Sequence, residues 1–297
     1  MSDRRRHLPL AAALALIAFV SLLWSPRAEA APKPGSRSSP EAGEAAKAAV
    51  LSATGAKAER ELASLPTSRP RTRSVAIKEV LPSSVRISVT DKGKQIRSAS
   101  GVVVASKMRN GVRVSHVITN AHVVEVEGGL ADRIDVLLDR KGQTFQTRAK
   151  VLAVGKVPDV DLALLEVSGL EVRPAALIQD RDLELGDEVI AVGAPYGKGL
   201  SVSSGIVSQL DLDETGTAIA LKTDAPIGYG ASGGGIFRVS DGRLIAVVEG
   251  YRTVKVSFPV DGKNISFDVP MPGETFAAPA AKIRSFLEGH GLLELIG

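Results

Sequence analysis

Residues 228–235 have the sequence GYGASGGG, in which five of the eight residues are glycine and one, Ser232, is serine. Glycine loses so much backbone freedom on folding that such a run is unfavourable inside a helix or a strand. The same run can form a tight loop whose backbone N–H groups converge on one point. Ser232 is therefore a candidate nucleophile beside an oxyanion hole, and a plain flexible turn is the alternative interpretation.

The sequence after residue 80 has the pattern of an antiparallel β protein. Short segments rich in Val and Ile alternate with hairpin signals such as Asn110-Gly111 and Asp241-Gly242. Strands do not alternate with helices, which argues against a parallel sheet. Many short strands predict a sandwich or a barrel, and their number favours two barrels, followed by one short C-terminal helix at residues 280–288. The predicted strands are residues 85–90, 101–106, 112–119, 134–138, 145–154, 162–167, 188–192, 201–210, 217–222, 235–239, 244–249, 254–260 and 265–269.

The first thirty residues predict export. They combine a basic segment at residues 4–6, an apolar run of 17 residues at 8–24 and a small-x-small cleavage site at 28–30. We expect a cleaved signal peptide at residues 1–30, a periplasmic or secreted protein, and no stable membrane insertion once the leader is removed. An uncleaved membrane anchor is the alternative, although the apolar run is at the short limit for a span.

Composition sets further bounds on the exported chain. It contains no cysteine, so its stability must come from core packing rather than from disulfides. Residues 31–78 predict a disordered or partly helical linker before a folded domain at 79–297. The formal charge of +4 belongs to the N-terminal segments, because residues 75–297 contain 25 Lys and Arg against 27 Asp and Glu. This balance does not favour a nucleic-acid partner.

Two residues far from the glycine-rich loop could complete a nucleophilic site. His122 follows the predicted strand 112–119, where a base at a strand end can reach into a cleft. Asp161 immediately precedes the apolar strand 162–167. A buried carboxylate there needs a partner, and the N–H of His122 would serve. Asp159 is the nearby rival, and a simply packed or exposed histidine is the alternative interpretation of His122.

Three segments place these residues in one order along the chain. TNAHVV at 119–124, DLALL at 161–165 and GASGG at 230–234 follow one another in the order His, Asp, Ser. They resemble the chymotrypsin-like (trypsin-like) serine peptidases, and within them most closely the HtrA/Deg group of DegP-like bacterial envelope proteases. The resemblance covers residues 80–287 and is specific because the segments occur together. Further segments similar to that group are VGAPYG at 192–197, SGIVS at 204–208 and TDA at 223–225.

The resemblance implies two antiparallel six-stranded β-barrels with the active site in the cleft between them. It also implies a hydrolase, a serine endopeptidase that cleaves exported, unfolded or damaged proteins through an acyl-enzyme, without a cofactor or a metal. Ser232 would attack the peptide carbonyl, His122 would take its proton, and Asp161 would orient His122. Gly230 and Ser232 would offer N–H groups to the oxyanion hole, with Ala231 between them. Protein or peptide substrates are the expected partners, and a homotrimer is an open option, since related envelope proteases are often trimers.

The resemblance also places a specificity pocket and shows departures from the family pattern. Ile227 and Tyr229, with the strand around 247–250, would line the primary pocket. No acidic residue stands at its expected base, so we expect a small or medium aliphatic residue before the scissile bond. Ala231 replaces the usual Asn or Asp, and Gly235 stands where proline often occurs, so the oxyanion loop is expected to be atypical. The C-terminal PDZ domain that the resemblance normally implies is not expected in this chain.

Two other functions fit parts of the pattern. The sequence Gly230-x-Ser232-x-Gly234 also matches the nucleophile elbow of α/β-hydrolases, with His290 as the later base. That elbow needs a strand–turn–helix context, whereas residues 236–239 predict another strand, so this interpretation is disfavoured. The stronger alternative is an inactive protease fold that serves as a peptide-binding or chaperone-like module of the bacterial envelope.

Overall fold

The computed structural model describes residues 71–140, 142–179, 182–260 and 263–296. The chain divides into two compact units, Met1–Thr67 and Ser68–Gly297, and the described residues all belong to the second. The expected signal peptide and most of the expected linker lie outside the described residues. Within the described ranges, no helix combines the length and the apolar character that a membrane span requires.

The first barrel is a closed ring of six antiparallel strands in the order β1-β2-β3-β8-β7-β6. Side chains alternate between the two faces of a strand, so Val85, Ile87 and Val89 of β1 all point into the barrel and are buried. The elements of this half are β1 (Ser84–Asp91), β2 (Lys94–Arg109), β3 (Val112–Thr119), α3 (Ala121–Val124), β4 (Glu125–Val126), β5 (Gly129–Leu130), β6 (Arg133–Arg140), β7 (Gln143–Val154) and β8 (Ala163–Ser168).

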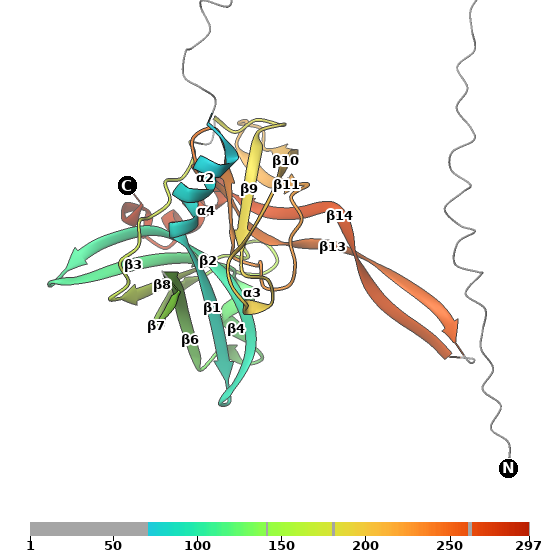
Figure 1. Ribbon diagram of the computed structural model, residues 1–297, viewed down its shortest axis with the longest axis horizontal. Helices are drawn as coiled ribbons and strands as arrows, with labels where there is room; N and C mark the ends of the chain where they lie inside the picture. The colour runs from blue at the N-terminus through green and yellow to red at the C-terminus, as the bar shows by residue number, and fades with distance from the viewer. Residues whose placement is uncertain (1–70, 141, 180–181, 261–262, 297) are drawn as a thin grey trace, which may run out of the picture. The chain divides into compact units, whose positions relative to one another are not determined.

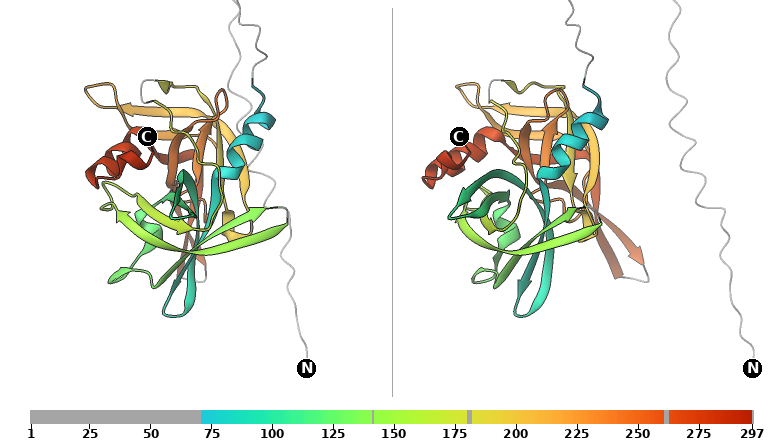
Figure 2. Two further views of the ribbon diagram at one scale, coloured as in Figure 1. Left: turned by 90° about the vertical axis from the view of Figure 1, so that its left-hand side faces the viewer. Right: turned by 60° about the vertical axis from the view of Figure 1, so that its left-hand side comes forward.

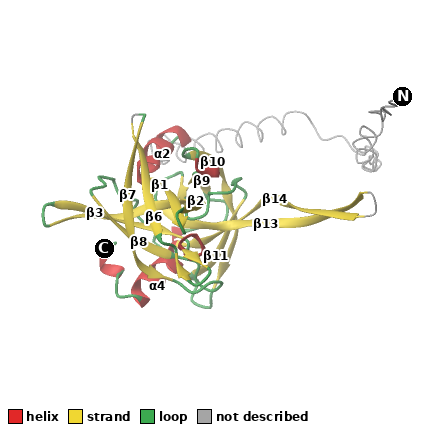
Figure 3. Cartoon of the chain, turned by 90° about the horizontal axis from the view of Figure 1, so that it is seen from below, coloured by secondary structure: helices red, strands yellow, loops and turns green. Residues whose placement is uncertain are grey.

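The second barrel is a closed ring of six antiparallel strands in the order β10-β11-β14-β13-β12-β9, and a helix follows it. The predicted all-β fold with two six-stranded barrels and a short C-terminal helix is therefore confirmed, and strands dominate the cartoon in Figure 3. The elements of this half are β9 (Glu188–Gly193), η3 (Pro195–Gly197), β10 (Ser201–Leu212), β11 (Ala218–Thr223), β12 (Gly235–Arg238), β13 (Leu244–Val260), β14 (Lys263–Pro279), α4 (Ala280–Gly289) and η4 (Leu293–Leu295).

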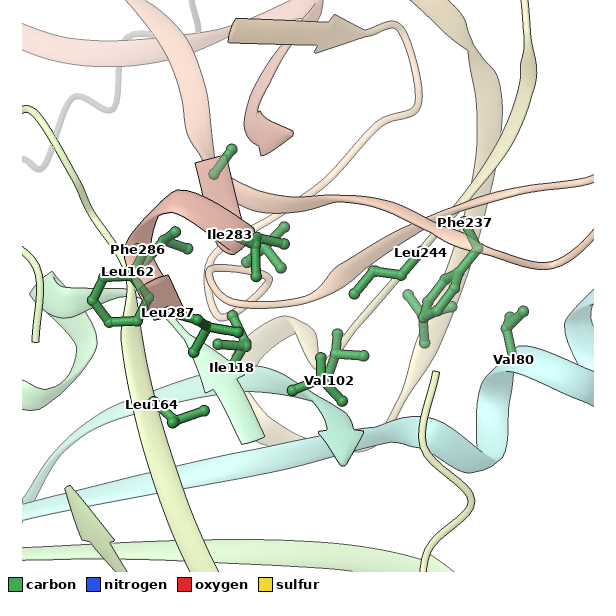
Figure 4. Packing of buried hydrophobic residues seen from close by; sticks show 14 of the residues in the cluster. Val80, Val102, Ile118, Leu162, Leu164, Phe237, Leu244, Ile283, Phe286 and Leu287 are labelled. Atoms are coloured by element: carbon green, nitrogen blue, oxygen red, sulfur yellow. The ribbon is translucent and has the colours of Figure 1, made fainter. Parts of the chain in front are cut away.

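One hydrophobic cluster joins the two barrels. It contains residues of both barrels and of α4, the C-terminal helix (Figure 4). Burying this many branched side chains at about 1.5–3 kcal/mol each holds the barrels in one relative position. Side chains contributed by the two barrels can therefore meet with a fixed geometry. The labelled members are Val80, Val102, Ile118, Leu162, Leu164, Phe237, Leu244, Ile283, Phe286 and Leu287.

The folded unit begins before residue 79, where the sequence analysis placed its start. The helix α2 (Arg73–Val80) and the turn η1 (Leu81–Ser83) precede β1. Thr72 caps the helix by accepting a hydrogen bond from the Val75 N–H, and Ala76 and Val80 are buried in the shared cluster. The sequence did not predict this helix, because only two of its residues face the core.

The hairpin of β13 and β14 extends well beyond the second barrel. The predicted strands 244–249 and 254–260 form one continuous strand, β13, and 265–269 lies within its partner β14. We call the outer part, residues 253–260 and 263–270, the arm. Figure 1 shows the arm projecting away from both barrels, and the right-hand view of Figure 2 shows the same projection from another direction. The period-2 pattern correctly predicted strands here but contained no signal that they would leave the barrel.

Candidate active site

His122 lies on the helical turn α3, which begins directly after β3 ends. Both oxygens of one carboxylate contact it. Asp161 Oδ1 accepts from the His122 backbone N–H at 2.9 Å, and Asp161 Oδ2 lies 2.6 Å from His122 Nδ1. An ionised carboxylate only accepts hydrogen bonds, so the Nδ1 proton faces Asp161 and Nε2 remains as the basic nitrogen. The pair therefore presents a base whose tautomer is fixed.

The environment of Asp161 keeps this carboxylate ionised. Burial alone raises its pKa, but hydrogen bonds from the His122 ring and backbone, with the charge of His122, outweigh burial and hold the pKa below the usual range. The rival residue, Asp159, is exposed. Asp161 is therefore the acid that the structure pairs with His122.

Two further side chains hold the turn that carries His122. The Arg97 guanidinium donates to the carbonyls of Val123 at 2.9 Å and Glu125 at 3.1 Å, and also to that of His122. A cation at the C-terminal carbonyls of a helical turn is favourable. Asn120 Nδ2 donates to the Asp161 carbonyl at 2.8 Å, which ties the start of the same turn to the segment that carries the acid.

The glycine-rich loop has the backbone conformation that its composition predicted. Gly230 has φ +92°, and a Cβ there would lie 2.6 Å from the Ala194 carbonyl oxygen, so only glycine fits without a shift. The Tyr229 carbonyl accepts from the Tyr196 N–H at 2.7 Å. Because the C=O and N–H of a trans peptide point in opposite directions, the Gly230 N–H points away from Tyr196.

The N–H groups on either side of Ala231 are free to bind an anion. Within the described ranges, the N–H groups of Gly230 and Ser232 have no hydrogen-bond acceptor. The Ala231 N–H instead donates to the Gly228 carbonyl at 3.0 Å, and Ala231 is buried in the second barrel. Ala231 is therefore a spacer, and its N–H is not available to an oxyanion hole.

Both His122 and Ser232 line one cavity of ≈610 Å³. Gly230, Ile227 and Tyr229 line it as well, so it combines five of the expected site residues, whereas Asp161 is not among the lining residues. No hydrogen bond joins Ser232 Oγ to His122 in the part of the chain that the structure describes. Such bonds often tighten only when substrate fills the site. The remaining lining residues are Ile96, Arg97, Ser98, Ala99, Val123, Tyr196, Gly228, Gly250, Tyr251 and Thr253.

All three tyrosines of the chain line this cavity, and the sequence analysis identified only Tyr229. Its ring lies 6.4 Å from that of Tyr196 and 5.9 Å, edge to face, from that of Tyr251. Burial, assisted by Tyr229, raises the pKa of Tyr251 to about 12, so the Tyr251 hydroxyl is uncharged at neutral pH. The sequence position of Tyr251, directly after the strand around residues 247–250 that was expected to line the pocket, could have indicated that Tyr251 lines the cavity.

The α/β-hydrolase alternative lacks both its base and its structural context. His290 does not line the cavity, and its Nδ1 lies 2.8 Å from the Phe286 carbonyl oxygen, with the two rings 4.8 Å apart. The loop that carries Ser232 continues into the strand β12 rather than into a helix.

Comparison with known families agrees with this geometry. A family model described as a trypsin-like peptidase domain matches residues 99–247, which is half of the chain. The chain belongs to the trypsin-like peptidase family. This member is similar to named serine proteases. It is 34% identical to the chloroplastic Protease Do-like 5 of Arabidopsis thaliana over 168 residues, which are 53% of this chain and 51% of that protein.

Two bacterial relatives place this trypsin-like peptidase near the Deg proteases. The periplasmic serine endoprotease DegP of Salmonella typhimurium is 34% identical over 58% of this chain and 33% of its own length. The serine endoprotease DegS of Escherichia coli is 30% identical over 69% of this chain and 52% of its own length. The chain thus spans about half or less of the length of the curated relatives it matches.

Solved structures agree on the fold. The HtrA-type protease AlgW with a tripeptide has a TM-score of 0.55 and 25% identity, over 74% of this chain and 65% of that one. A serine endoprotease from Yersinia pestis has a TM-score of 0.54 and 23% identity, over 76% and 68%. The expected resemblance to HtrA/Deg proteases is confirmed.

Ser100 of β2 connects the parts of the site in this trypsin-like peptidase, a role that its sequence context does not indicate. Its Oγ donates to the Gly230 carbonyl at 2.6 Å and accepts from the Ala194 N–H at 2.8 Å. Its N–H donates to the Ser232 carbonyl at 2.9 Å, and its carbonyl accepts from Thr119 Oγ1 at 2.8 Å. Ser100 is fully buried, so water cannot replace these bonds.

We expect Ser100→Ala to lower kcat for peptide hydrolysis about tenfold, because losing a buried hydrogen bond to the oxyanion loop costs about 1–2 kcal/mol. KM should change little, whereas a peptide boronic acid, which forms a tetrahedral adduct, should bind about tenfold more weakly. Steady-state kinetics and inhibitor titration measure both quantities.

Ser115→Ala is the matched control for this prediction. Ser115 is equally buried, and its Oγ donates to the Leu170 carbonyl at 2.9 Å, within the first barrel. This variant should lose stability but keep kcat. Equal losses of kcat in the two variants would contradict a positioning role for Ser100.

Proposed function

We propose that the chain is a serine endopeptidase that hydrolyses peptide bonds of exported, unfolded proteins in the bacterial envelope. The observation that carries the proposal is one cavity lined by His122, which is paired with the Asp161 carboxylate, by Ser232, and by the loop with the free N–H groups of Gly230 and Ser232. A base with a fixed tautomer, a hydroxyl and an anion-binding loop are the components that acyl transfer requires.

In the proposed mechanism, Ser232 Oγ attacks the substrate carbonyl while His122 Nε2 takes the Ser232 proton. Asp161 holds the ring and stabilises the imidazolium that forms. The N–H groups of Gly230 and Ser232 bind the developing oxyanion, and His122 then gives the proton to the leaving amine. Water, activated by His122, releases the acid product from the acyl-enzyme.

The lining of the cavity supports an apolar preference. Ile227 and the tyrosines at 196, 229 and 251 supply apolar and aromatic surface, and Arg97 is the sole formally charged lining residue of the described chain. With no carboxylate to pair with a Lys or Arg side chain, an aliphatic residue before the scissile bond is favoured. The envelope location is supported by the leader sequence and by the periplasmic DegP relatives.

Hydrolysis of an unfolded protein tests this proposal. The purified chain should cleave reduced casein, and peptides with Val before the scissile bond should have a higher kcat/KM than peptides with Lys there. A serine-directed fluorophosphonate should abolish both activities. Binding of casein without cleavage, under conditions in which a control protease is active, would instead support the peptide-binding module.

A further inference from the structure

Glu249 is a carboxylate beside the site that the proposed mechanism does not use. Val248, the residue before it on β13, accepts from the Gly233 N–H at 2.9 Å and donates to the Gly234 carbonyl at 2.8 Å. Gly250, the residue after it, lines the cavity. The Glu249 side chain is only 17% exposed and is not among the residues that line the cavity in the described part of the chain. Glu249 can therefore act on the reaction only through its neighbours.

A β-bulge sets the direction of the Glu249 side chain. Val248 pairs with Ala277 of β14, and the adjacent residue of β14, Phe276, pairs with Gly250. Glu249 therefore has no paired residue on β14 and is the extra residue of the bulge. Bulges are common beside active sites, where they redirect a side chain.

Lys282, in the first turn of α4, holds the Glu249 carboxylate. Lys282 Nζ lies 3.2 Å from Glu249 Oε1, and the two side chains are both largely buried. The next residue of α4, Ile283, belongs to the cluster that joins the barrels, and so does Leu162, which follows Asp161 (Figure 4). β13, α4 and the segment that carries Asp161 therefore converge at the edge of this cluster.

Charges of the site act on Glu249. Burial raises the pKa of the Glu249 carboxyl above its usual range, and the cation of Lys282 offsets only part of this rise. Within the described residues, the other charges that act on this carboxyl are that of Asp161, which raises the pKa, and that of His122, which lowers it. Coulomb interactions are reciprocal, so an ionised Glu249 favours the protonated, positively charged form of His122.

We infer that Glu249 is a positioning residue whose carboxylate, held by Lys282, stabilises the imidazolium form of His122. The inference rests on the proposed function, in which this imidazolium forms each time Ser232 attacks a substrate. Lys282 is needed because a largely buried carboxylate without a partner takes up a proton and loses its charge. The helix α4 thereby contributes to the site although none of its residues lines the cavity.

An NMR titration of the His122 ring tests the inference without any turnover. The full chain with Ser232→Ala is compared with the same chain that also carries Glu249→Gln, and the His122 signal is assigned by its loss in His122→Phe. Glu249→Gln should lower the midpoint of the His122 titration by about half a pH unit, which is about a threefold change in the equilibrium between imidazole and imidazolium. Glu249→Asp keeps the charge and should shift the midpoint less than Glu249→Gln.

Glu274→Gln is the matched control. Glu274 forms a similar ion pair with Lys222, at 3.0 Å, in the second barrel, and neither residue lines the cavity. The control should lose an ion pair of the same kind and leave the His122 titration unchanged.

Kinetics of the active chain should show the same change. Glu249→Gln should move the acidic limb of the pH profile of kcat/KM to lower pH by about half a unit, because that limb reports the ionisation of the free enzyme's base. At the plateau kcat should fall about threefold, since the imidazolium of the transition state is less stabilised, whereas KM should change little. Loss of a merely supporting ion pair would lower the thermal midpoint and leave the pH profile in place.

The contrary outcomes are distinct. An unchanged His122 titration in Glu249→Gln would overturn the inference, and so would an equal shift in Glu274→Gln. A chain that cleaves no peptide but shows the expected shift of the titration would contradict the proposed function and leave the electrostatic link between Glu249 and His122 standing.

Discussion

Replacing Ser232 by alanine is expected to lower kcat for peptide hydrolysis about a millionfold. Loss of the nucleophile removes the covalent route altogether, and only the oxyanion loop and substrate binding remain to assist attack by water. The Ser232 side chain is only partly buried and makes no hydrogen bond within the described residues, so the thermal midpoint should stay within about 2 °C of the wild type. Active-site titration and steady-state kinetics on casein and on a short peptide measure the effect.

Ser208→Ala provides the control for this substitution. Ser208 is an exposed serine on β10 that does not line the cavity, so its loss should leave kcat unchanged. If the Ser232 variant retained more than about 1% of wild-type kcat, the nucleophile would be a residue other than Ser232.

Asp161→Asn is expected to lower kcat about 10⁴-fold at neutral pH. In the wild type, Asp161 Oδ1 accepts from the His122 backbone N–H, which is always a donor. Asparagine has one oxygen, and that oxygen must stay on the backbone N–H. Its NH₂ group then faces His122 Nδ1, which must accept, so the ring proton moves to Nε2. A protonated Nε2 cannot take the proton of Ser232.

The same variant makes a prediction about stability and pH. The folded-state pKa of Asp161 is lowered, so its charge stabilises the fold above the ordinary aspartate pKa, and this contribution disappears as the pH falls through the folded-state value. The gap in thermal midpoint between wild type and Asp161→Asn should therefore close on acidification. Asp159→Asn, at the exposed neighbouring acid, should have the kcat of the wild type and the same thermal midpoint as the wild type at each pH. An Asp161 variant with more than about a tenth of wild-type kcat would contradict the assigned orientation of His122.

Much of the fold was predictable because alternation of apolar side chains is a local property. The alternation of Val85, Ile87 and Val89 indicates a half-buried strand, whichever strand it pairs with. The number of such segments predicts a fold of two barrels. The departure of the arm was not predictable, since Val254 and Phe258 alternate in the same way as barrel residues. Which strand covers a given face is decided by tertiary contacts.

The site was predictable where a residue type is chemically unusual, as for Ser232 among glycines. It was not predictable where the role depends on distant contacts. Ser100 is an ordinary strand serine whose Oγ meets the carbonyl of Gly230, 130 positions later in the chain. Likewise, Ala231 fits an oxyanion loop by position, and only the bond from its N–H to the Gly228 carbonyl excludes it as a donor.

Mapping the residue that a fluorophosphonate modifies tests the central claim most directly. One adduct is expected, on Ser232, found by mass spectrometry of the digested protein, and Asp161→Asn should be labelled at least about 10³-fold more slowly. An adduct on another residue, or no adduct under conditions that label a control serine protease, would contradict the assignment of His122, Asp161 and Ser232 as one catalytic unit.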